Sequence, residues 1–458
     1  MLTYDLKKTP GVPLYEALYR CIRADILSGV LTAGQKLPSK RTLAANLEVS
    51  KITVEAAYGQ LLSEGFICAR EKVGYFVERV ESRPRQEAPA CPPEPEVTPA
   101  FGVDLAGDGP AKFPFSVWSR LQRCVMLDYG EKLLRPLPNQ GYLELRRAIA
   151  AHLAAFRGMR VSPEHILIGA GTDFLYNLLI QLLGRSRRYA VEEPGYGKIR
   201  QIYAAGGAEC VDAPMDDQGV IPAVLDHADV LHISPSHHFP TGLVTPVSRR
   251  LELLNQAARD EKWIIEDDYD SEFRFDARPK PAMYALDRSG RVIYMNTFSK
   301  SLAPSIRISY MVLPAALMEE FQERLGFYSC TVPSFEQYTL ERFLSQGHFE
   351  KHINRMRKLY KNRRNKLVEL LNRSPIAEKI TILEQDAGLH FLLRFDTDLP
   401  DGELVAQWAA AGIRIMALSD YYHGPVPETD RNCLVVNYDR LTDEDLAELE
   451  KRLNVLVR

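Results

Sequence analysis

A proline-rich segment divides the chain into two parts of unequal size. Residues 80–100 read VESRPRQEAPACPPEPEVTPA, with prolines at positions 84, 89, 92, 93, 95 and 99. Such a stretch cannot bury a hydrophobic core, and it favours extended polyproline conformations. We therefore predict a linker over residues 80–100 that joins two domains, residues 1–79 and residues 101–458. A proline-rich loop inside a single domain is the alternative.

The two parts differ in charge. The whole chain of 458 residues contains 57 Lys and Arg and 60 Asp and Glu, a net charge of −3. Residues 1–80 hold 11 of the basic and 8 of the acidic residues, so their net charge is +3 and that of the remainder is −6. The near-neutral total averages these two values, and it does not argue against a nucleic-acid partner for the first part.

Cysteine usage and hydropathy exclude several classes of protein. The seven cysteines are dispersed without a C-x-x-C pair, which suits reduced thiols in the cytoplasm rather than disulfides or zinc. No run approaches about 18 uncharged apolar residues, so we expect no membrane span. His348 and His352 have a spacing that could ligate a metal, but no third ligand is apparent, and we expect no metal site.

The first part has the pattern of a winged helix–turn–helix. Apolar residues at helical spacing predict a helix over Leu14–Leu27, and Ser39 is expected to cap a second helix. We expect a third helix over Lys51–Glu64, with Val54, Ala57, Leu61 and Leu62 facing inward. The runs Phe66–Arg70 and Gly74–Val77 predict a hairpin. In this plan the third helix enters the major groove of DNA.

Two motifs sharpen this interpretation. The first part contains the motifs Leu37-Pro38-Ser39-x-Arg41-x-Leu43-Ala44 and Val49-Ser50-x-x-Thr53-Val54. These motifs resemble the DNA-binding domain of the GntR family. The resemblance implies a winged helix–turn–helix that binds double-stranded DNA; a protein-interaction domain is the alternative. The residues expected to contact DNA are Lys40, Arg41, Ser50, Lys51, Thr53 and Gly74.

The second part alternates β-rich runs with helical patterns. The runs are His165–Ile168, Val230–Ile233, Trp263–Glu266 and Val292–Met295. Strands separated by helices predict an α/β domain with a mainly parallel sheet, and such sheets bind ligands at the carboxyl ends of their strands.

Polar residues follow several of these runs. Lys300 stands among hydroxyl residues, with Arg307 seven residues further on, which suits an imine between lysine and a phosphorylated aldehyde. A carboxylate within 266–270 could hold a pyridinium proton. The turn at 169–173 precedes an apolar helix, and backbone N–H groups at a helix start bind phosphate.

Together these features resemble fold type I enzymes that use pyridoxal 5'-phosphate, the aminotransferase type, over about residues 103–457. The resemblance implies that Lys300 is the Schiff-base lysine, that Asp267 pairs with the pyridine nitrogen, and that Tyr269 approaches the phenolic oxygen. It implies that Tyr196 stacks on the ring. The implied phosphate-binding residues are Gly171, Thr172, Asp173, Thr297, Ser299 and Arg307.

Two departures put ordinary transamination in doubt. Phe239 stands where aminotransferases have the asparagine that bonds the phenolic oxygen. The stretch 433–438 lacks the arginine that usually clamps the substrate carboxylate, and an apolar residue cannot replace that bidentate contact.

The combination of the two parts resembles the MocR subfamily of regulators. It implies a transcription regulator that senses an amine, an amino acid or pyridoxal phosphate itself through an aldimine at Lys300. It also implies a domain-swapped homodimer on paired half-sites. GABA-responsive members carry arginines where this chain has Lys198 and Asp420, so the effector need not be GABA. The alternative is an active aminotransferase with a DNA-binding appendage.

A basic run over residues 352–366 leaves two interpretations open. It contains Arg357, Arg363 and Arg364 among other cations. A solvated helix face is one interpretation, and an accessory surface that faces DNA is the other.

Overall fold

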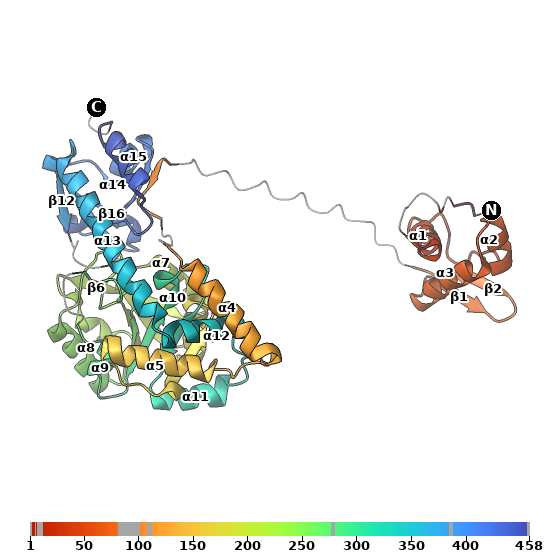
Figure 1. The fold of residues 1–458 in the computed structure, drawn as a ribbon, viewed down its shortest axis with the longest axis horizontal. Coiled ribbons are helices and arrows are strands. Elements are labelled where there is room, and N and C mark those ends of the chain that lie inside the picture. The colour runs from red at the N-terminus through yellow and green to blue at the C-terminus, as the bar shows by residue number, and fades with distance from the viewer. Residues whose placement is uncertain are drawn as a thin grey trace. The chain divides into compact units, whose positions relative to one another are not determined.

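The chain forms two compact units, Met1–Thr98 and Pro99–Arg458 (Figure 1). The computed structural model describes residues 2–4, 6, 12–80, 101–107, 112–275, 280–383 and 388–455. The predicted linker, residues 80–100, lies outside the described residues except for Val80. Within the described ranges, no helix is both long and apolar enough to cross a membrane.

The first unit is a winged helix–turn–helix. Its helices are α1 (Leu14–Leu27), α2 (Lys40–Asn46) and α3 (Lys51–Ser63), and its antiparallel hairpin is β1 (Ile67–Arg70) with β2 (Gly74–Val77). The predicted helices and hairpin are confirmed. Both predicted helix starts are capped by serine, because the Ser39 Oγ accepts a hydrogen bond from Thr42 N and the Ser50 Oγ accepts one from Thr53 N.

The side of α3 that was predicted to face inward packs on the core of this unit. Val54, Ala57 and Leu61 are fully buried, and Leu62 is partly buried against the same core. The fully buried Tyr58 fills the space beside Val54, Ala57 and Leu61, and its hydroxyl donates a hydrogen bond to Pro38 O at 3.0 Å. An aromatic side chain can be buried here because its polar group finds a partner.

The second unit is built on an eight-stranded sheet of order β4-β11-β10-β9-β8-β5-β6-β7. Its strands are β4 (Ile166–Gly169), β5 (Arg188–Glu193), β6 (Glu209–Asp216), β7 (Gly219–Val220), β8 (Val230–Ile233), β9 (Trp263–Asp267), β10 (Val292–Thr297) and β11 (Ser309–Val312). The pairs β10–β9, β9–β8, β8–β5 and β5–β6 are parallel, whereas β11 runs antiparallel to both of its neighbours. The predicted mainly parallel sheet is confirmed.

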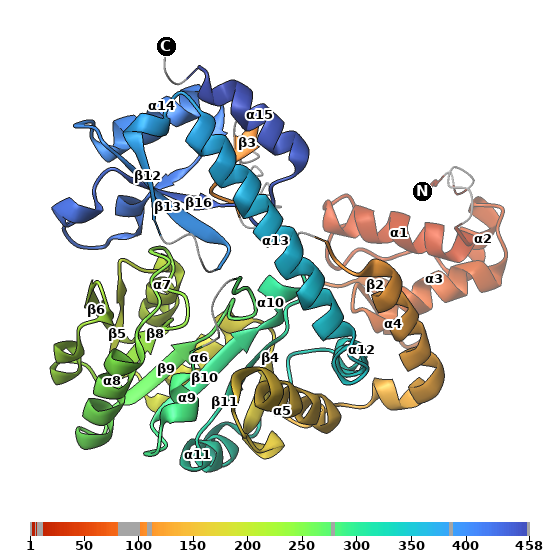
Figure 2. The same cartoon turned by 60° about the vertical axis from the view of Figure 1, so that its left-hand side comes forward.

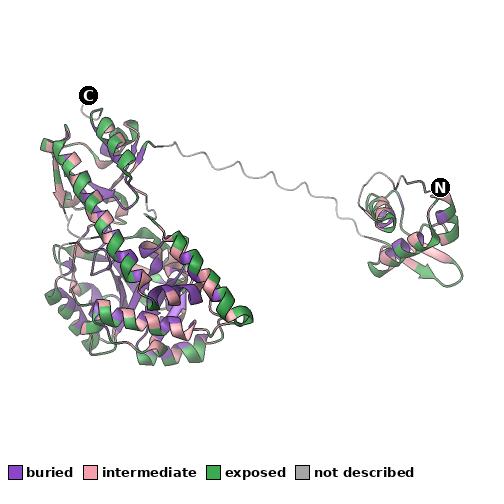
Figure 3. Ribbon diagram, in the orientation of Figure 1, coloured by how far each residue is buried: buried purple, intermediate pink, exposed green. Residues whose placement is uncertain are grey.

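Helices cover this sheet (Figure 2). They are α4 (Phe115–Tyr129), α5 (Leu143–Arg157), α6 (Thr172–Leu183), α7 (Gly197–Ala205), α8 (Val247–Arg259), α9 (Met283–Leu286), α10 (Phe298–Ser301), α11 (Ala315–Leu325) and α12 (Ser334–Ser345). The central strands are buried on both faces, as Figure 3 shows. Their continuous apolar runs follow from this position, since a parallel sheet is covered on both sides.

A smaller layer follows along the chain. The helix α13 (His348–Arg373) runs from α12 to α14 (Asp401–Ala410) and α15 (Asp443–Leu453) (Figure 2). A second sheet has the order β12-β13-β16-β15, formed by β12 (Ile380–Leu383), β13 (His390–Phe395), β15 (Met416–Ala417) and β16 (Cys433–Asn437). The short strands β3 (Val103–Asp104) and β14 (Ile413–Arg414) pair in parallel.

Short 3-10 helices complete the described structure. They are η2 (Gly130–Leu134), η3 (Pro163–His165), η4 (Pro222–Asp226), η5 (Ala377–Lys379), η6 (Leu418–Tyr421) and η7 (Glu428–Asp430).

Candidate functional site

The first turn of α3 presents the side chains expected to meet DNA. Lys51 is exposed, and Ser50 caps the helix with its Oγ 2.8 Å from the Thr53 Oγ1. This turn also carries Ile52, which was not predicted as a DNA contact and is 77% exposed. An isoleucine outside the apolar face of α3 was the available signal. Apolar side chains in the major groove can contact the methyl group of thymine.

Lys40 has a structural partner. Its Nζ lies 2.6 Å from the Glu55 Oε1 and stands over the ring of Tyr75, 5.4 Å from the ring centre. The hydrogen bond to Glu55 raises the pKa of Lys40 above its ordinary value. Lys40 therefore joins α2 to α3 and to the hairpin. Arg41, the next residue, is exposed.

The hairpin brings Gly74 to the start of β2. Its φ is +130°, a backbone conformation that side-chain-bearing residues rarely adopt. A Cβ at this position would lie 3.2 Å from the Lys36 Cε. Glycine therefore lets the strand pass close to the Lys36 side chain.

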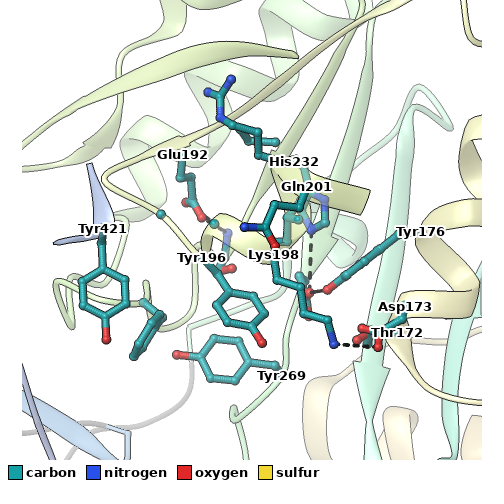
Figure 4. A pocket seen from close by; sticks show the side chains of 18 of the residues that line it. Thr172, Asp173, Tyr176, Glu192, Tyr196, Lys198, Gln201, His232, Tyr269 and Tyr421 are labelled. Atoms are coloured by element: carbon teal, nitrogen blue, oxygen red, sulfur yellow. Dashed lines mark hydrogen bonds and ion pairs between the residues drawn. The ribbon is translucent and has the colours of Figure 1, made fainter. Parts of the chain in front are cut away.

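A cavity of about 460 Å³ opens in the second unit where several strands of the large sheet end (Figure 4). Nine of the ten residues predicted to hold the cofactor line it: Thr172, Asp173, Tyr196, Asp267, Tyr269, Thr297, Ser299, Lys300 and Arg307. The tenth, Gly171, is the residue before α6. Residues that are up to 135 positions apart in the chain thus meet at one place.

One end of the cavity is suited to an anion. Gly171 has φ +88°, and a Cβ there would lie 2.2 Å from the Arg307 Nη2, so only glycine leaves room for this guanidinium at the start of α6. The Arg307 Nη2 lies 3.2 Å from the Asp173 Oδ2, and the Lys198 Nζ lies 2.7 Å from the same oxygen. Backbone N–H groups of the first turn of α6 add to this positive environment.

The hydroxyls beside Lys300 are partly engaged. The Thr297 Oγ1 caps α10 by accepting a hydrogen bond from Ser299 N at 3.1 Å, and it accepts another from the Ser309 Oγ. Its own proton is left to donate. The Ser299 Oγ donates to Ile306 O at 3.0 Å, so this hydroxyl must rotate before it can donate to a phosphate.

Asp267, the last residue of β9, offers a buried acceptor. Its Oδ2 accepts a hydrogen bond from the Tyr176 hydroxyl at 2.5 Å, and the His232 Nε2 lies 3.6 Å from the same oxygen. Its Oδ1 is buried and has no hydrogen-bond partner among the described residues. Burial raises the pKa of Tyr176 well above its ordinary value, so the hydroxyl remains a donor.

An unpaired buried carboxylate oxygen is costly, and a ligand N–H would satisfy it. The sequence did not indicate Tyr176, which donates a hydrogen bond to the other oxygen of Asp267, or His232, which lies near that oxygen. Tyr176 lies four residues after Thr172 on α6, and this helical spacing was the available signal.

The position expected to hold asparagine is apolar here. Phe239 packs edge-to-face against His390 and Tyr421, with ring centres 5.0 and 5.1 Å away. The Tyr269 hydroxyl instead lies 3.3 Å from the His237 Nδ1, which is 2.7 Å from the Asp270 Oδ2. A Tyr–His–Asp contact thus stands beside the place where the asparagine amide would be.

A buried glutamic acid, Glu192, lies close to His238, which follows His237 in the chain. The Glu192 side chain accepts hydrogen bonds from Ser234 N, and the His238 Nε2 lies 3.6 Å from it. Burial raises the pKa of Glu192 to about 8, and burial lowers the pKa of His238 to about 3. Both groups are therefore mainly uncharged at neutral pH.

The arginines that line the cavity in the described part of the chain are Arg200 and Arg307. Arg200 is paired with Asp212, and Arg307 lies at the anion end. The stretch 433–437 forms the buried strand β16 and supplies no arginine. A bidentate clamp for a substrate carboxylate is therefore absent from the described wall of the cavity.

Three arginines of the basic run on α13 have structural partners. The Arg357 Nε donates to Glu272 O, Arg363 donates to Asp439 O, and Arg364 stands over the ring of Phe275. The histidines on this helix are also engaged, since His352 Nε2 lies 2.9 Å from Ser301 O and His348 Nε2 lies 3.3 Å from the Arg120 Nη2. Exposed cations remain at Lys351, Arg355 and Lys358.

Comparison with known proteins agrees with this two-part plan. Residues 14–77 match the family of bacterial regulatory proteins of the gntR type, and residues 109–453 match the class I and II aminotransferases. The chain is 36% identical over 462 residues to an uncharacterized HTH-type transcriptional regulator, YdeL of Bacillus subtilis, covering 99% of this chain and 98% of that protein. It is 35% identical over 445 residues to the probable rhizopine catabolism regulatory protein MocR of Rhizobium meliloti, covering 92% and 90%.

Among solved structures, a kynurenine aminotransferase of Pyrococcus horikoshii superposes with a TM-score of 0.68 and 25% identity, covering 79% of this chain and 92% of that one. A winged helix followed by an aminotransferase fold defines a class of DNA-binding proteins built on the fold of a metabolic enzyme. The chain belongs to the MocR-type transcriptional regulators of the GntR family, to which its curated relatives also belong.

Proposed function

We propose that this regulator holds pyridoxal 5'-phosphate in the cavity of its second unit and uses it to sense a small molecule. One observation supports the proposal above the others. The buried Asp267 Oδ1 lacks a hydrogen-bond partner among the described residues, in the same cavity as Lys300 and Arg307. A pyridine N–H would satisfy that oxygen, and a phosphate would satisfy the anion end.

Each residue has a role that its position supports. Asp267 would bind the ring nitrogen, Tyr269 would bind the phenolic oxygen, and Tyr196 would stack on a face of the ring. The phosphate would be held by Gly171, Thr172, Asp173, Thr297, Ser299 and Arg307. Lys300 would carry the covalent attachment. When bound, the cofactor supplies an aldehyde that bonds to primary amines and a ring that withdraws electrons.

The effector would be an amine, an amino acid or pyridoxal phosphate itself. We expect at most vestigial transamination, because the described wall of the cavity offers no free arginine for a substrate carboxylate. For sensing, the effector must bind one state of the second unit better than another, and that state must differ in its effect on DNA binding.

A spectral and DNA-binding titration tests the proposal. The purified full chain, loaded with pyridoxal phosphate, is expected to show a visible absorption band that a subset of amines or amino acids shifts. The same compounds should change its affinity for a duplex selected by the protein from a random pool. Without the band, the cofactor assignment fails; multiple turnovers with amino donors and keto acceptors would instead support an aminotransferase.

We infer a homodimer, domain-swapped as in the MocR-type arrangement, that binds paired half-sites. Phe115 and Leu127 on α4 and Leu134 in η2 have exposed fractions of 76%, 75% and 74%. Large apolar side chains at this density on neighbouring elements are typical of a surface covered by another protein. Two copies would bring two winged helices to DNA, which calls for two half-sites.

The substitution Lys51→Gln tests the DNA interface. We expect weaker DNA binding and a plot of log affinity against log salt that is less steep by about 1, because one cation no longer displaces a counterion. The measurement is fluorescence anisotropy at several salt concentrations. The matched control, Lys379→Gln, removes the same charge from the exposed η5 and should leave both quantities unchanged. An unchanged slope in the Lys51 variant would exclude a phosphate contact.

A further inference from the structure

Aromatic rings form one end of the cavity. The rings of Tyr196 and Phe239 are 6.1 Å apart at 85°, and those of Phe239 and Tyr421 are 5.1 Å apart at 88°. In Figure 4, Tyr421, Tyr196 and Tyr269 lie at this end and Asp173 lies at the other, with Lys198 between them and its amine on Asp173. These edge-to-face contacts bring three aromatic residues to one part of the cavity wall, and exposed faces of aromatic rings attract cations.

Two segments of the chain are fastened together to make this end. Gly195 N donates to Tyr421 O at 3.1 Å, and Gly424 N donates to the Glu193 Oε1 at 2.7 Å. The loop after β5 and the segment that begins with η6 are therefore held side by side. The aromatic end has a fixed geometry rather than one that a ligand must assemble.

The charges at this end are negative. Glu193 and Asp420 both line the cavity, and the Asp420 Oδ2 accepts a hydrogen bond from Ala417 N at 3.0 Å. Besides Lys300, the lysines and arginines that line the described wall have carboxylate partners: Lys198 and Arg307 contact Asp173, and Arg200 is paired with Asp212. A ligand carboxylate would thus meet aromatic faces and carboxylates here, whereas a ligand ammonium group would be attracted by both.

We propose that the effector is a short aliphatic diamine whose second ammonium group is held by Tyr196, Phe239 and Tyr421 with the carboxylates of Glu193 and Asp420. This inference rests on the proposed sensing function and specifies its ligand class. The first amino group points toward Lys300, and the second remains non-covalent and charged. A cavity of about 460 Å³ accommodates a chain of this size at the cofactor's side.

Three compounds of equal chain length test the ligand class. We would titrate the cofactor-loaded full chain with 1,4-diaminobutane, 4-aminobutanoate and butylamine, by calorimetry and by the change in DNA affinity. We expect the diamine to bind about tenfold more tightly than butylamine, and 4-aminobutanoate to bind most weakly. Equal binding of diamine and butylamine, or tighter binding of 4-aminobutanoate, overturns the diamine assignment and leaves sensing intact. If no amine or amino acid binds, amine sensing itself fails, and the diamine assignment fails with it.

Variants locate the charged end. Asp420→Asn keeps an acceptor for Ala417 N and removes the charge, so it should weaken diamine binding about fivefold to tenfold without changing butylamine binding. Phe239→Leu should also weaken diamine binding. Asp420→Glu, which keeps the charge, should bind the diamine more tightly than Asp420→Asn does. The control Glu403→Gln makes the same charge change on the exposed side of α14. If the Asp420 and Glu403 variants behave alike, the second ammonium group does not bind at this end.

Discussion

Replacing Lys300 with alanine is expected to abolish the visible absorption band of the protein and its response to amines. Lys300 lies in α10, directly after β10, and lines the same cavity as Asp267 and Arg307. In the proposed function the ε-amino group would form the covalent attachment to the cofactor's aldehyde, and alanine has no nucleophile. The measurements are the absorption spectrum after incubation with pyridoxal phosphate and the DNA affinity with and without amines.

Two further variants separate covalent attachment from charge and from the mere presence of lysine. Lys300→Arg keeps a cation in α10 but should lose the band as completely as Lys300→Ala, because a guanidinium does not form the attachment. Lys262→Ala should keep the band, because Lys262 lies at the amino end of β9, whereas Asp267 of the cavity lies at its carboxyl end. The Lys262 Nζ is 3.2 Å from the Asp229 Oδ1, which lies at the amino end of β8. Circular dichroism should show all three variants folded. A band that persists in both Lys300 variants would contradict the assignment.

The sequence predicted the local features of both units because each depends on neighbours along the chain. Helical spacing places α1 and α3 within a residue of their observed ends, and the Ser39 cap places the start of α2. Lys300 and Arg307 are seven residues apart and follow one strand, so a motif can identify both. Such features need no knowledge of how distant strands pair.

Contacts between distant segments could not be predicted in this way. The aromatic end of the cavity joins Tyr196, Phe239 and Tyr421, which come from the segments after β5, after β8 and in η6. The same limit applies to charge. Lys40 is among the residues predicted to contact DNA, and Arg363 belongs to the basic run 352–366. Their partners within the protein, Glu55 and Asp439 O, come from other elements. A charge count cannot distinguish a solvated cation from one that holds the fold together.

A buried ion pair supports the site from behind, and breaking it is expected to be strongly destabilising. The Arg157 Nε lies 2.9 Å from the Asp268 Oδ2, and the two side chains are 1% and 0% exposed. Arg157 ends α5, whereas Asp268 directly follows Asp267 of the cavity. The Tyr294 hydroxyl donates to the Asp268 Oδ2 at 2.7 Å. The pair therefore fixes the backbone that carries Asp267.

Asp268→Ala should lower the free energy of unfolding of the second unit by about 3–5 kcal/mol, because it leaves the Arg157 guanidinium buried without its counter-charge. Denaturant unfolding followed by tryptophan fluorescence measures this change. The double variant Arg157→Met, Asp268→Leu should be less destabilised than Asp268→Ala, since it removes both buried charges. Asp260→Ala breaks the exposed pair with Arg259 and should cause no measurable change.

The same pair should make stability depend on pH in one direction. Burial alone would raise the pKa of Asp268, but the Arg157 guanidinium and hydrogen bonds from Ser236 and Tyr294 lower it below its ordinary value of 3.8. A group whose pKa is lowered by folding stabilises the protein fully above its ordinary pKa, and that stabilisation is lost as the pH falls below it. Between pH 7 and about pH 3 the free energy of unfolding of the native protein should therefore fall. The fall should be smaller in the double variant. If both proteins lose stability equally over this range, the acid sensitivity arises from other carboxylates.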